Sequence, residues 1–204
     1  MRTSVTAFKQ KKRISLLWLF AFVFLPAIAF VQPYWVGGRL HEALEVGGLM
    51  LVFFGILGRL WSILYIGAHK NRKLVDVGPY SMTRNPLYLS SLAGVFGVGL
   101  MVGSLVVALS MTTACYVVFH YTARREALYL RSLFGPAYDD YARRTPLFLP
   151  NPSLYKGATS ITFSQPALAA TFRDSLFLLA LFPLIEGLEY LRTTGHLPTL
   201  VTLF

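Results

Sequence analysis

Long runs of apolar residues, separated by short polar segments, dominate the pattern of the chain. The first run, residues 14–32, contains no charged residue, and the second, residues 43–68, contains Arg59. A helix of about 20 apolar residues, rising about 1.5 Å per residue, crosses a hydrocarbon core of about 30 Å. Both runs are therefore predicted to be transmembrane helices, and the first is longer than the apolar region of a signal peptide, so we expect it to be retained.

The third run, residues 87–122, is too long for a single crossing. Gly103 and Ser104 lie near its middle, so the pattern predicts two antiparallel helices joined by a very tight turn. A fifth span is expected over residues 172–191, where Glu186 and Glu189 lie toward its end. The predicted fold class is all-α, a polytopic membrane protein with about five transmembrane helices.

Composition supports a membrane protein and argues against a nucleic-acid partner. Hydrophobic residues make up 55% of the 204 residues and charged residues only 14%, which is well to the apolar side of soluble domains. The net charge of +10 comes from basic residues that separate the apolar runs rather than share one solvated face. The single cysteine, Cys115, excludes an intrachain disulfide and any cluster of cysteine ligands for a metal.

The basic residues also predict the orientation, because Lys and Arg near membrane ends accumulate on the cytoplasmic side. Fifteen of the nineteen lie in residues 1–13, 69–86 and 123–171, whereas the 33–42 loop has Arg39 alone. We therefore expect a protein of the inner or plasma membrane of a bacterium, with its N-terminus inside and its C-terminus outside. The expected divisions are a basic cytoplasmic N-terminus (1–13), two transmembrane helices (14–68), a core (69–150), a linker (151–171) and the fifth span with the C-terminus (172–204).

The stretch GPYSMTRNPLYLSS, residues 78–91, places several polar residues directly before an apolar run. Pro86 stands where a helix would begin and Asn85 just before it can cap that helix, so Arg84 and Asn85 are predicted to lie at a helix N-terminus on the cytoplasmic surface. Unpaired N–H groups and an arginine there suit a carboxylate or phosphate. The alternative is an ordinary cytoplasmic arginine beside a helix cap.

A second polar segment follows the hairpin on the same predicted face. Residues 124–135 are amphipathic, and Gly135-Pro136 ends the helix that they predict. Glu126 lies on it, either paired with a neighbouring arginine or accepting hydrogen bonds from a ribose or an ammonium group. The histidines are scattered and the usual hydrolase, nucleotide-loop and metal-ligand spacings are absent, so no metal site is expected. The glycines of GVFGVGL, residues 94–100, indicate close helix packing instead.

These motifs together resemble the integral-membrane methyltransferases of the isoprenylcysteine carboxyl methyltransferase and phospholipid N-methyltransferase superfamily. The resemblance covers roughly residues 50–150. Its motifs are Leu74-Val75, Gly78-Pro79-Tyr80, Arg84-Asn85-Pro86-Leu87-Tyr88 and the run from Glu126 to Phe134-Gly135, with Tyr138, Tyr141 and Pro150 behind them. Two positions depart from the family pattern, since Asn85 replaces the usual histidine and Ala127 the second glutamate.

The resemblance implies S-adenosylmethionine as cofactor, in a cytoplasmic pocket between the ends of the hairpin helices, closed by the segment that follows. The residues implied to bind it are Leu74, Val75, Gly78, Tyr80, Arg84, Asn85, Tyr88 and Glu126. Arg124 is expected to orient an acceptor carboxylate, and Arg59, inside the second span, has a role in the reaction, an ion pair or a snorkelling position.

The acceptor is expected to be a lipophilic small molecule, a lipid or a lipidated substrate, reached through the membrane. Its reacting group stays open among carboxylate, thiol, amine and lipid headgroup. Two alternatives to methyl transfer also stay open. One is a sterol-reductase-like enzyme that uses NADPH, and the other is a degenerate scaffold that kept the fold but not the chemistry.

Overall fold

The computed structural model describes residue 24 and residues 30–35, 37–69, 72–198 and 201–203. The first predicted span, 14–32, lies almost entirely outside these residues. The long helices are α2 (Arg39–Ile66), α4 (Pro86–Met101), α5 (Leu105–Phe134) and α7 (Gln165–Thr193). The short elements are α3 (Pro79–Met82), α6 (Pro136–Arg144), the 3₁₀ helix η1 (Pro152–Leu154) and the strands β1 (Val31–Pro33) and β2 (Val201–Leu203).

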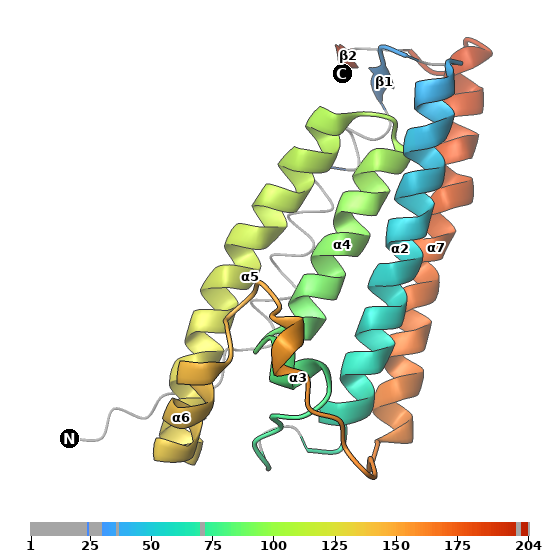
Figure 1. Cartoon of the computed structure of the whole chain (residues 1–204). Coiled ribbons are helices and arrows are strands. Elements are labelled where there is room, and N and C mark those ends of the chain that lie inside the picture. Colours follow the sequence, from blue (N-terminus) through green and yellow to red (C-terminus); the bar gives the residue numbers. More distant parts are fainter. Residues whose placement is uncertain (1–23, 25–29, 36, 70–71, 199–200, 204) are drawn as a thin grey trace.

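Three of the described helices, α2, α5 and α7, are long and apolar enough to cross a membrane. α4 is apolar but has only 16 residues. The four long helices run side by side, with α2 in contact with both α4 and α7 and α4 in contact with α5 (Figure 1). α7 begins at Gln165, before the predicted start at residue 172, because the Ser164 hydroxyl caps it by accepting a hydrogen bond from the Ala167 N–H.

Glycines hold α2 and α4 at close range, as the GVFGVGL pattern predicted. A Cβ atom on Gly97 would lie 2.5 Å from the Gly48 carbonyl oxygen, and one on Gly48 would lie 2.6 Å from the Gly97 carbonyl oxygen. A Cβ on Gly55 would likewise lie 2.7 Å from the backbone oxygen of Ser90. The backbones therefore meet without intervening side chains, the arrangement by which small residues pack helices in membranes.

The predicted hairpin is confirmed, with its turn at the predicted residues. α4 ends at Met101 and α5 starts at Leu105, and Gly103 takes a φ of 76°, which favours glycine. The Ser104 hydroxyl caps α5 by accepting a hydrogen bond from the Val107 N–H at 3.3 Å. Met101 and Val107 are buried there in one apolar cluster with residues of α2 and α7.

The bundle has two different ends (Figure 1). At one, called the strand end here, β1 and β2 form a parallel pair in which Val31 is opposite Val201. The all-α class is confirmed for the bundle, but Val31 and Gln32, predicted to end the first span, lie in this short strand pair instead. The other, called the motif end, carries α3, α6 and η1. Trp35 ties the strand end together, because its Nε1–H donates to the Gly103 carbonyl at 2.7 Å.

Candidate functional site at the motif end

The Gly78-Pro79-Tyr80 turn forms the floor of the candidate site. Gly78 has a φ of 60°, and a Cβ on it would lie 2.3 Å from the Tyr65 ring, so no other residue fits without displacing that ring. Its N–H donates to the Lys156 carbonyl at 2.7 Å. Tyr80 is buried in a small apolar cluster with Tyr65 and Val75. Two of the residues predicted to bind the cofactor, Tyr80 and Val75, therefore pack in the same cluster.

A segment after α6, residues 145–151, crosses the residues that lead into α4, and we call it the strap. The Arg84 N–H donates to the Pro146 carbonyl at 2.9 Å, and the Asn151 N–H donates to the Met82 carbonyl at 2.9 Å. The Thr83 hydroxyl donates to the Phe148 carbonyl at 3.0 Å. The backbone around Arg84 is therefore held in place by hydrogen bonds to the strap.

Asn85 joins the strap rather than capping its own helix. It occupies the N-cap position of α4, but its side chain makes no capping hydrogen bond within the described chain. Its Nδ2 group instead donates to the Leu147 carbonyl at 3.0 Å. The predicted side-chain cap is thus wrong, because the strap carbonyl offers the amide a partner that lies 62 residues further along the chain.

Tyr88 and Glu126 connect α4 with the last turns of α5. The Tyr88 hydroxyl donates to Glu126 Oε2 at 3.0 Å, and its ring stacks on Phe119 with centroids 4.8 Å apart. Glu126 was expected either to pair with an arginine or to bind a ligand. Among the described residues its carboxylate accepts a hydrogen bond from the Tyr88 hydroxyl, and it keeps further lone pairs for another donor.

At this end Tyr80 Oη and Arg84 Nε are two of the buried polar atoms that lack a hydrogen-bond partner among the described residues, and His120 Nδ1, beside the strap, is another. Burial, together with the nearby Tyr141, Glu126 and Tyr88, raises the pKa of the Tyr80 hydroxyl well above its ordinary value. The hydroxyl therefore stays protonated and can donate. Buried polar groups are seldom left unsatisfied in native proteins, so Tyr80 Oη and Arg84 Nε are suited to a ligand that the protein binds.

α6 braces the floor from the other side. The Tyr141 hydroxyl donates to the Tyr80 carbonyl at 2.8 Å, and Arg144 forms an ion pair with Asp76. Burial raises the pKa of Tyr141, so this donor also stays protonated. Tyr141 belongs to one of the motifs in the sequence, but the pattern there does not indicate this bracing role.

An aromatic group between α5 and the strap was also missed. The rings of His120 and Phe148 stack with centroids 5.7 Å apart, and Tyr116 packs against both. His120 had been set aside as one of several scattered histidines. The stacking of its ring on Phe148 shows that His120 helps to hold the strap on α5.

The other predicted residues lie around this site rather than in one cluster. Leu74 is half-buried beside buried Val75, and Arg124 is exposed on α5. Arg59 lies on α2, where its Nη1 donates to the Ser91 hydroxyl on α4 at 2.6 Å, and Asp174 on α7 is the acid whose charge acts on it. Arg59 thus links α2 to α4 through a hydrogen bond, and its role in the reaction, as part of an ion pair or as a snorkelling side chain stays a prediction.

The donor set fits the amino-acid part of S-adenosylmethionine. A guanidinium and a carboxylate are complementary to its carboxylate and ammonium groups, and Arg84 and Glu126 supply one of each. The orphaned Tyr80 hydroxyl adds a donor that is already desolvated.

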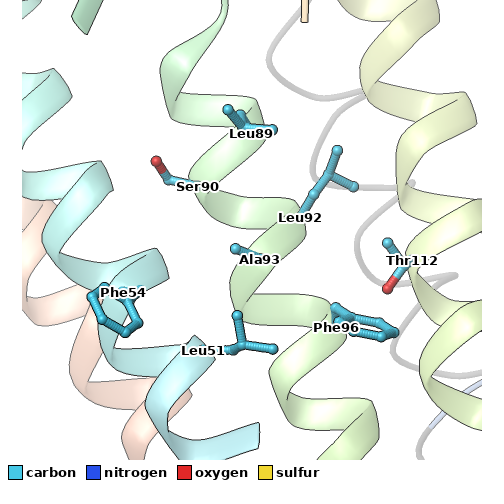
Figure 2. Close-up of a pocket in the computed structure, with 8 residues that line it drawn as sticks. All are labelled: Leu51, Phe54, Leu89, Ser90, Leu92, Ala93, Phe96 and Thr112. Atoms are coloured by element: carbon cyan, nitrogen blue, oxygen red, sulfur yellow. The ribbon is translucent and has the colours of Figure 1, made fainter. Parts of the chain in front are cut away.

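An apolar pocket of about 470 Å³ opens between α2, α4 and α5 (Figure 2). Its walls are aliphatic and aromatic apart from two hydroxyl groups, those of Ser90 and Thr112. The lining residues are Leu51, Phe54, Leu89, Ser90, Leu92, Ala93, Phe96 and Thr112. On α4 the lining starts at Leu89, directly after Tyr88.

Comparisons with known proteins agree with the motifs. The sequence pattern of the family described as phospholipid methyltransferase matches residues 44–137. The chain is 36% identical to the cobalt-zinc-cadmium resistance protein CzcN of Cupriavidus metallidurans over 88% of its own length and 82% of that relative. It is 32% identical to the nickel-cobalt-cadmium resistance protein NccN of Alcaligenes xylosoxydans xylosoxydans over 97% of its length and 92% of that relative. No solved structure matches the chain significantly.

Proposed function

Since the chain belongs to the phospholipid methyltransferase family, we propose that it transfers a methyl group from S-adenosylmethionine to a hydrophobic acceptor held in the membrane. The observation that carries the proposal is the arrangement at the motif end. There, Tyr88 donates to Glu126, and Tyr80 Oη and Arg84 Nε are buried donors without a hydrogen-bond partner among the residues that the structure describes. The family match supports methyl transfer over reduction by NADPH.

The chain's own residues would act by binding and alignment. S-adenosylmethionine supplies an electrophilic methyl carbon on a sulfonium, and in-line displacement there needs little acid–base help from a protein. Arg84 would bind the carboxylate of the methionine part, and Glu126 would accept from its ammonium group or from the ribose. Tyr80 would donate from the floor, while the strap and Asn85 would keep water out.

The apolar pocket of Figure 2 is suited to the chain of the acceptor. A pocket open between helices admits a prenyl or acyl chain directly from the bilayer, and its lining on α4 adjoins Tyr88. Arg124, exposed on α5, would orient an anionic acceptor group. Arg59 would act indirectly, by holding Ser91 and thereby α4 in place.

The names of the two relatives suggest the setting of the reaction. Both are named for resistance to cobalt and cadmium, and one each for zinc or nickel. We propose that the methylated product contributes to tolerance of such ions. Growth of a deletion strain on cobalt or zinc salts, complemented by the wild-type gene or by Glu126→Gln, tests whether tolerance requires the site.

The direct test of methyl transfer uses membranes with and without the protein, supplied with S-adenosylmethionine labelled in the methyl group. A labelled lipophilic product is expected with the wild-type protein and not with Glu126→Gln. Binding of NADPH in place of S-adenosylmethionine by the purified protein would point to the reductase, and binding of neither would point to the scaffold.

A further inference from the structure

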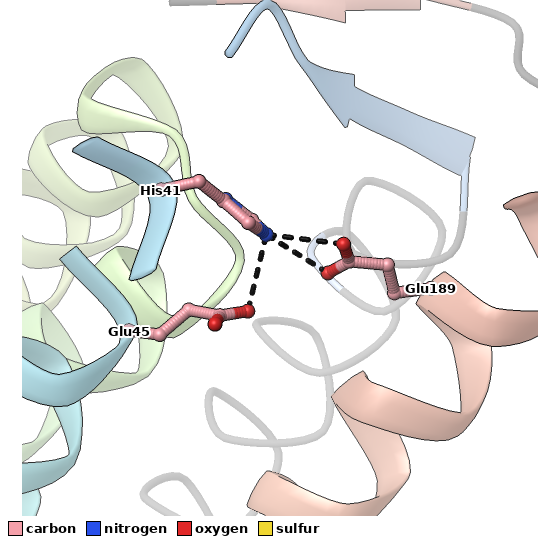
Figure 3. Close-up of side chains that lie close together, drawn as sticks. All are labelled: His41, Glu45 and Glu189. Carbon is pink, nitrogen blue, oxygen red and sulfur yellow. Dashed lines mark hydrogen bonds and ion pairs between the residues drawn. The ribbon is translucent and has the colours of Figure 1, made fainter. Parts of the chain in front are cut away.

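Three side chains meet at the strand end, away from the site described above (Figure 3). His41 and Glu45 lie one turn apart on α2, and Glu189 faces them from α7. His41 Nε2 lies 3.1 Å from Glu45 Oε1 and 3.1 Å from each carboxylate oxygen of Glu189. The His41 side chain is 5% exposed and the two glutamates 19% and 20%, so all three are largely withdrawn from water.

Hydrogen bonding does not account for this arrangement. A neutral imidazole carries at most one hydrogen on Nε2, yet three carboxylate oxygens lie within reach of that nitrogen. The other ring nitrogen, Nδ1, is buried and has no hydrogen-bond partner among the described residues. One donor therefore faces two largely buried carboxylates, whose mutual repulsion is costly unless cations balance it, and Arg192, whose charge acts on Glu189, balances at most one of them.

Metal coordination accounts for it. A tetrahedral Zn²⁺ ion with nitrogen and oxygen ligands at about 2.0–2.2 Å separates neighbouring ligand atoms by about 3.3 Å. The separations of 3.1 Å around His41 Nε2 are close to that value, and one ligand atom from each of the three residues lies within 4.8 Å of the others. We propose that His41, Glu45 and Glu189 bind a divalent transition-metal ion of the Zn²⁺ class, through Nε2 and the two carboxylates.

The surrounding charges favour a cation at this place. Glu42 and Glu186 add two exposed carboxylates whose charges act on Glu45, and Arg192 is the base whose charge acts on Glu189. An imidazole ligand selects a borderline transition ion over Mg²⁺ or Ca²⁺, which prefer all-oxygen sites. The sequence does not indicate this site, because Glu189 is 148 residues from His41 and the three residues do not form a short motif with the spacing of metal ligands.

The test is calorimetric titration of the full chain, purified with a histidine-free tag and stripped with a chelator, with Zn²⁺ and separately with Ca²⁺. One Zn²⁺ per chain is expected, with no comparable binding of Ca²⁺. Glu189→Gln and Glu45→Gln are expected to weaken Zn²⁺ binding at least tenfold. The matched controls, Glu186→Gln and Glu42→Gln, remove the same charge from the same helices at exposed positions and should stay within about threefold of wild type.

Equal loss in Glu189→Gln and Glu186→Gln, or failure of the wild type to bind Zn²⁺ stoichiometrically, would overturn the proposal and leave His41 as a hydrogen-bonding partner of two carboxylates. If a ligand variant does not fold, the Co²⁺ absorption of the wild-type chain decides. Intense bands of a four-coordinate ion support the site, and the weak bands of a six-coordinate, water-ligated ion contradict it. Binding of S-adenosylmethionine, at the opposite end, is measured separately and does not enter this result.

Discussion

The hydroxyl group of Tyr88, in the first turn of α4, donates a hydrogen bond of 3.0 Å to Glu126 Oε2, near the far end of α5. The two residues are 38 positions apart, and the whole hairpin lies between them in the chain. Their contact fixes the separation of the two helices where the resemblance implied a cofactor pocket. The Glu126 charge also acts on the buried Tyr80 hydroxyl and helps to raise its pKa.

Removing either partner of this contact should weaken binding of S-adenosylmethionine, but unequally. Glu126→Ala removes a proposed ligand group, so we expect the Kd to rise at least about tenfold, or about 1.4 kcal/mol. Tyr88→Phe removes only the group that orients it, and a rise of about threefold is expected. In the Glu126→Ala background, Tyr88→Phe should add almost nothing. Full additivity of the two changes, measured by calorimetry, would show that Tyr88 does not act through Glu126.

Tyr80→Phe should change stability and binding in opposite directions. The Tyr80 hydroxyl is buried without a partner in the described chain, so its removal relieves a desolvation cost of about 1 kcal/mol or more. Without S-adenosylmethionine, the melting temperature should rise by about 2–4 °C. Affinity for S-adenosylmethionine should fall, because a donor is lost. A variant that melts later and binds normally would remove Tyr80 from the cofactor site.

Arg84 should matter for binding through its guanidinium rather than its charge alone. Arg84→Ala is expected to raise the Kd for S-adenosylmethionine at least about tenfold, and Arg84→Lys should recover only part of the loss, since lysine cannot grip a carboxylate with two parallel hydrogen bonds. The matched control is Arg143→Ala, an exposed arginine of α6 paired with Asp140. Equal affinities in Arg84→Ala and Arg143→Ala would make Arg84 an ordinary surface base.

Asn85 offers a test of the strap. Its Nδ2 donates to the Leu147 carbonyl, so Asn85→Leu should release the strap, lower the melting temperature and weaken cofactor binding together. Asn85→His keeps a donor and should retain activity, with a new limb near pH 6.5 in the pH–rate profile if the imidazole faces the site. Unchanged cofactor affinity in a Leu variant that melts early would confine Asn85 to a structural role.

The sequence was sufficient for features that depend on local pattern. The apolar runs located the long helices, and Gly103-Ser104 located the hairpin turn, because a tight turn needs a residue that accepts positive φ. Tyr80, Arg84 and Glu126 were singled out because they lie in polar motifs beside apolar runs and because those motifs resemble the family pattern, and their roles stay predictions. Local pattern also explains one error, since an asparagine before Pro86 is typical of a helix cap.

What the sequence did not provide depends on contacts between distant segments. Nothing near Asn85 indicates that Leu147 will accept its hydrogen bond, and nothing near His41 indicates Glu189. The strand pair is another example, because Val31 and Val201 stand at opposite ends of the chain and the apolar run through Val31 looks continuous. Such pairings follow from how the helices pack, which single-chain periodicity does not contain.

Membrane orientation gives the last prediction, since all arguments about a water-soluble cofactor require the motif end to face the cytoplasm. Basic side chains gather at the motif end, whereas the strand end carries Glu42, Glu45, Glu186 and Glu189, as the positive-inside rule expects. Ala137 on α6 and Thr193 at the end of α7 are both exposed, and the native Cys115 is buried. In intact cells, an impermeant thiol reagent should therefore label Thr193→Cys and spare Ala137→Cys, which should react only after the membrane is opened. Labelling of Ala137→Cys in intact cells would show that the orientation is the opposite one. The motif end would then face away from the cytoplasm and could not bind cytoplasmic S-adenosylmethionine.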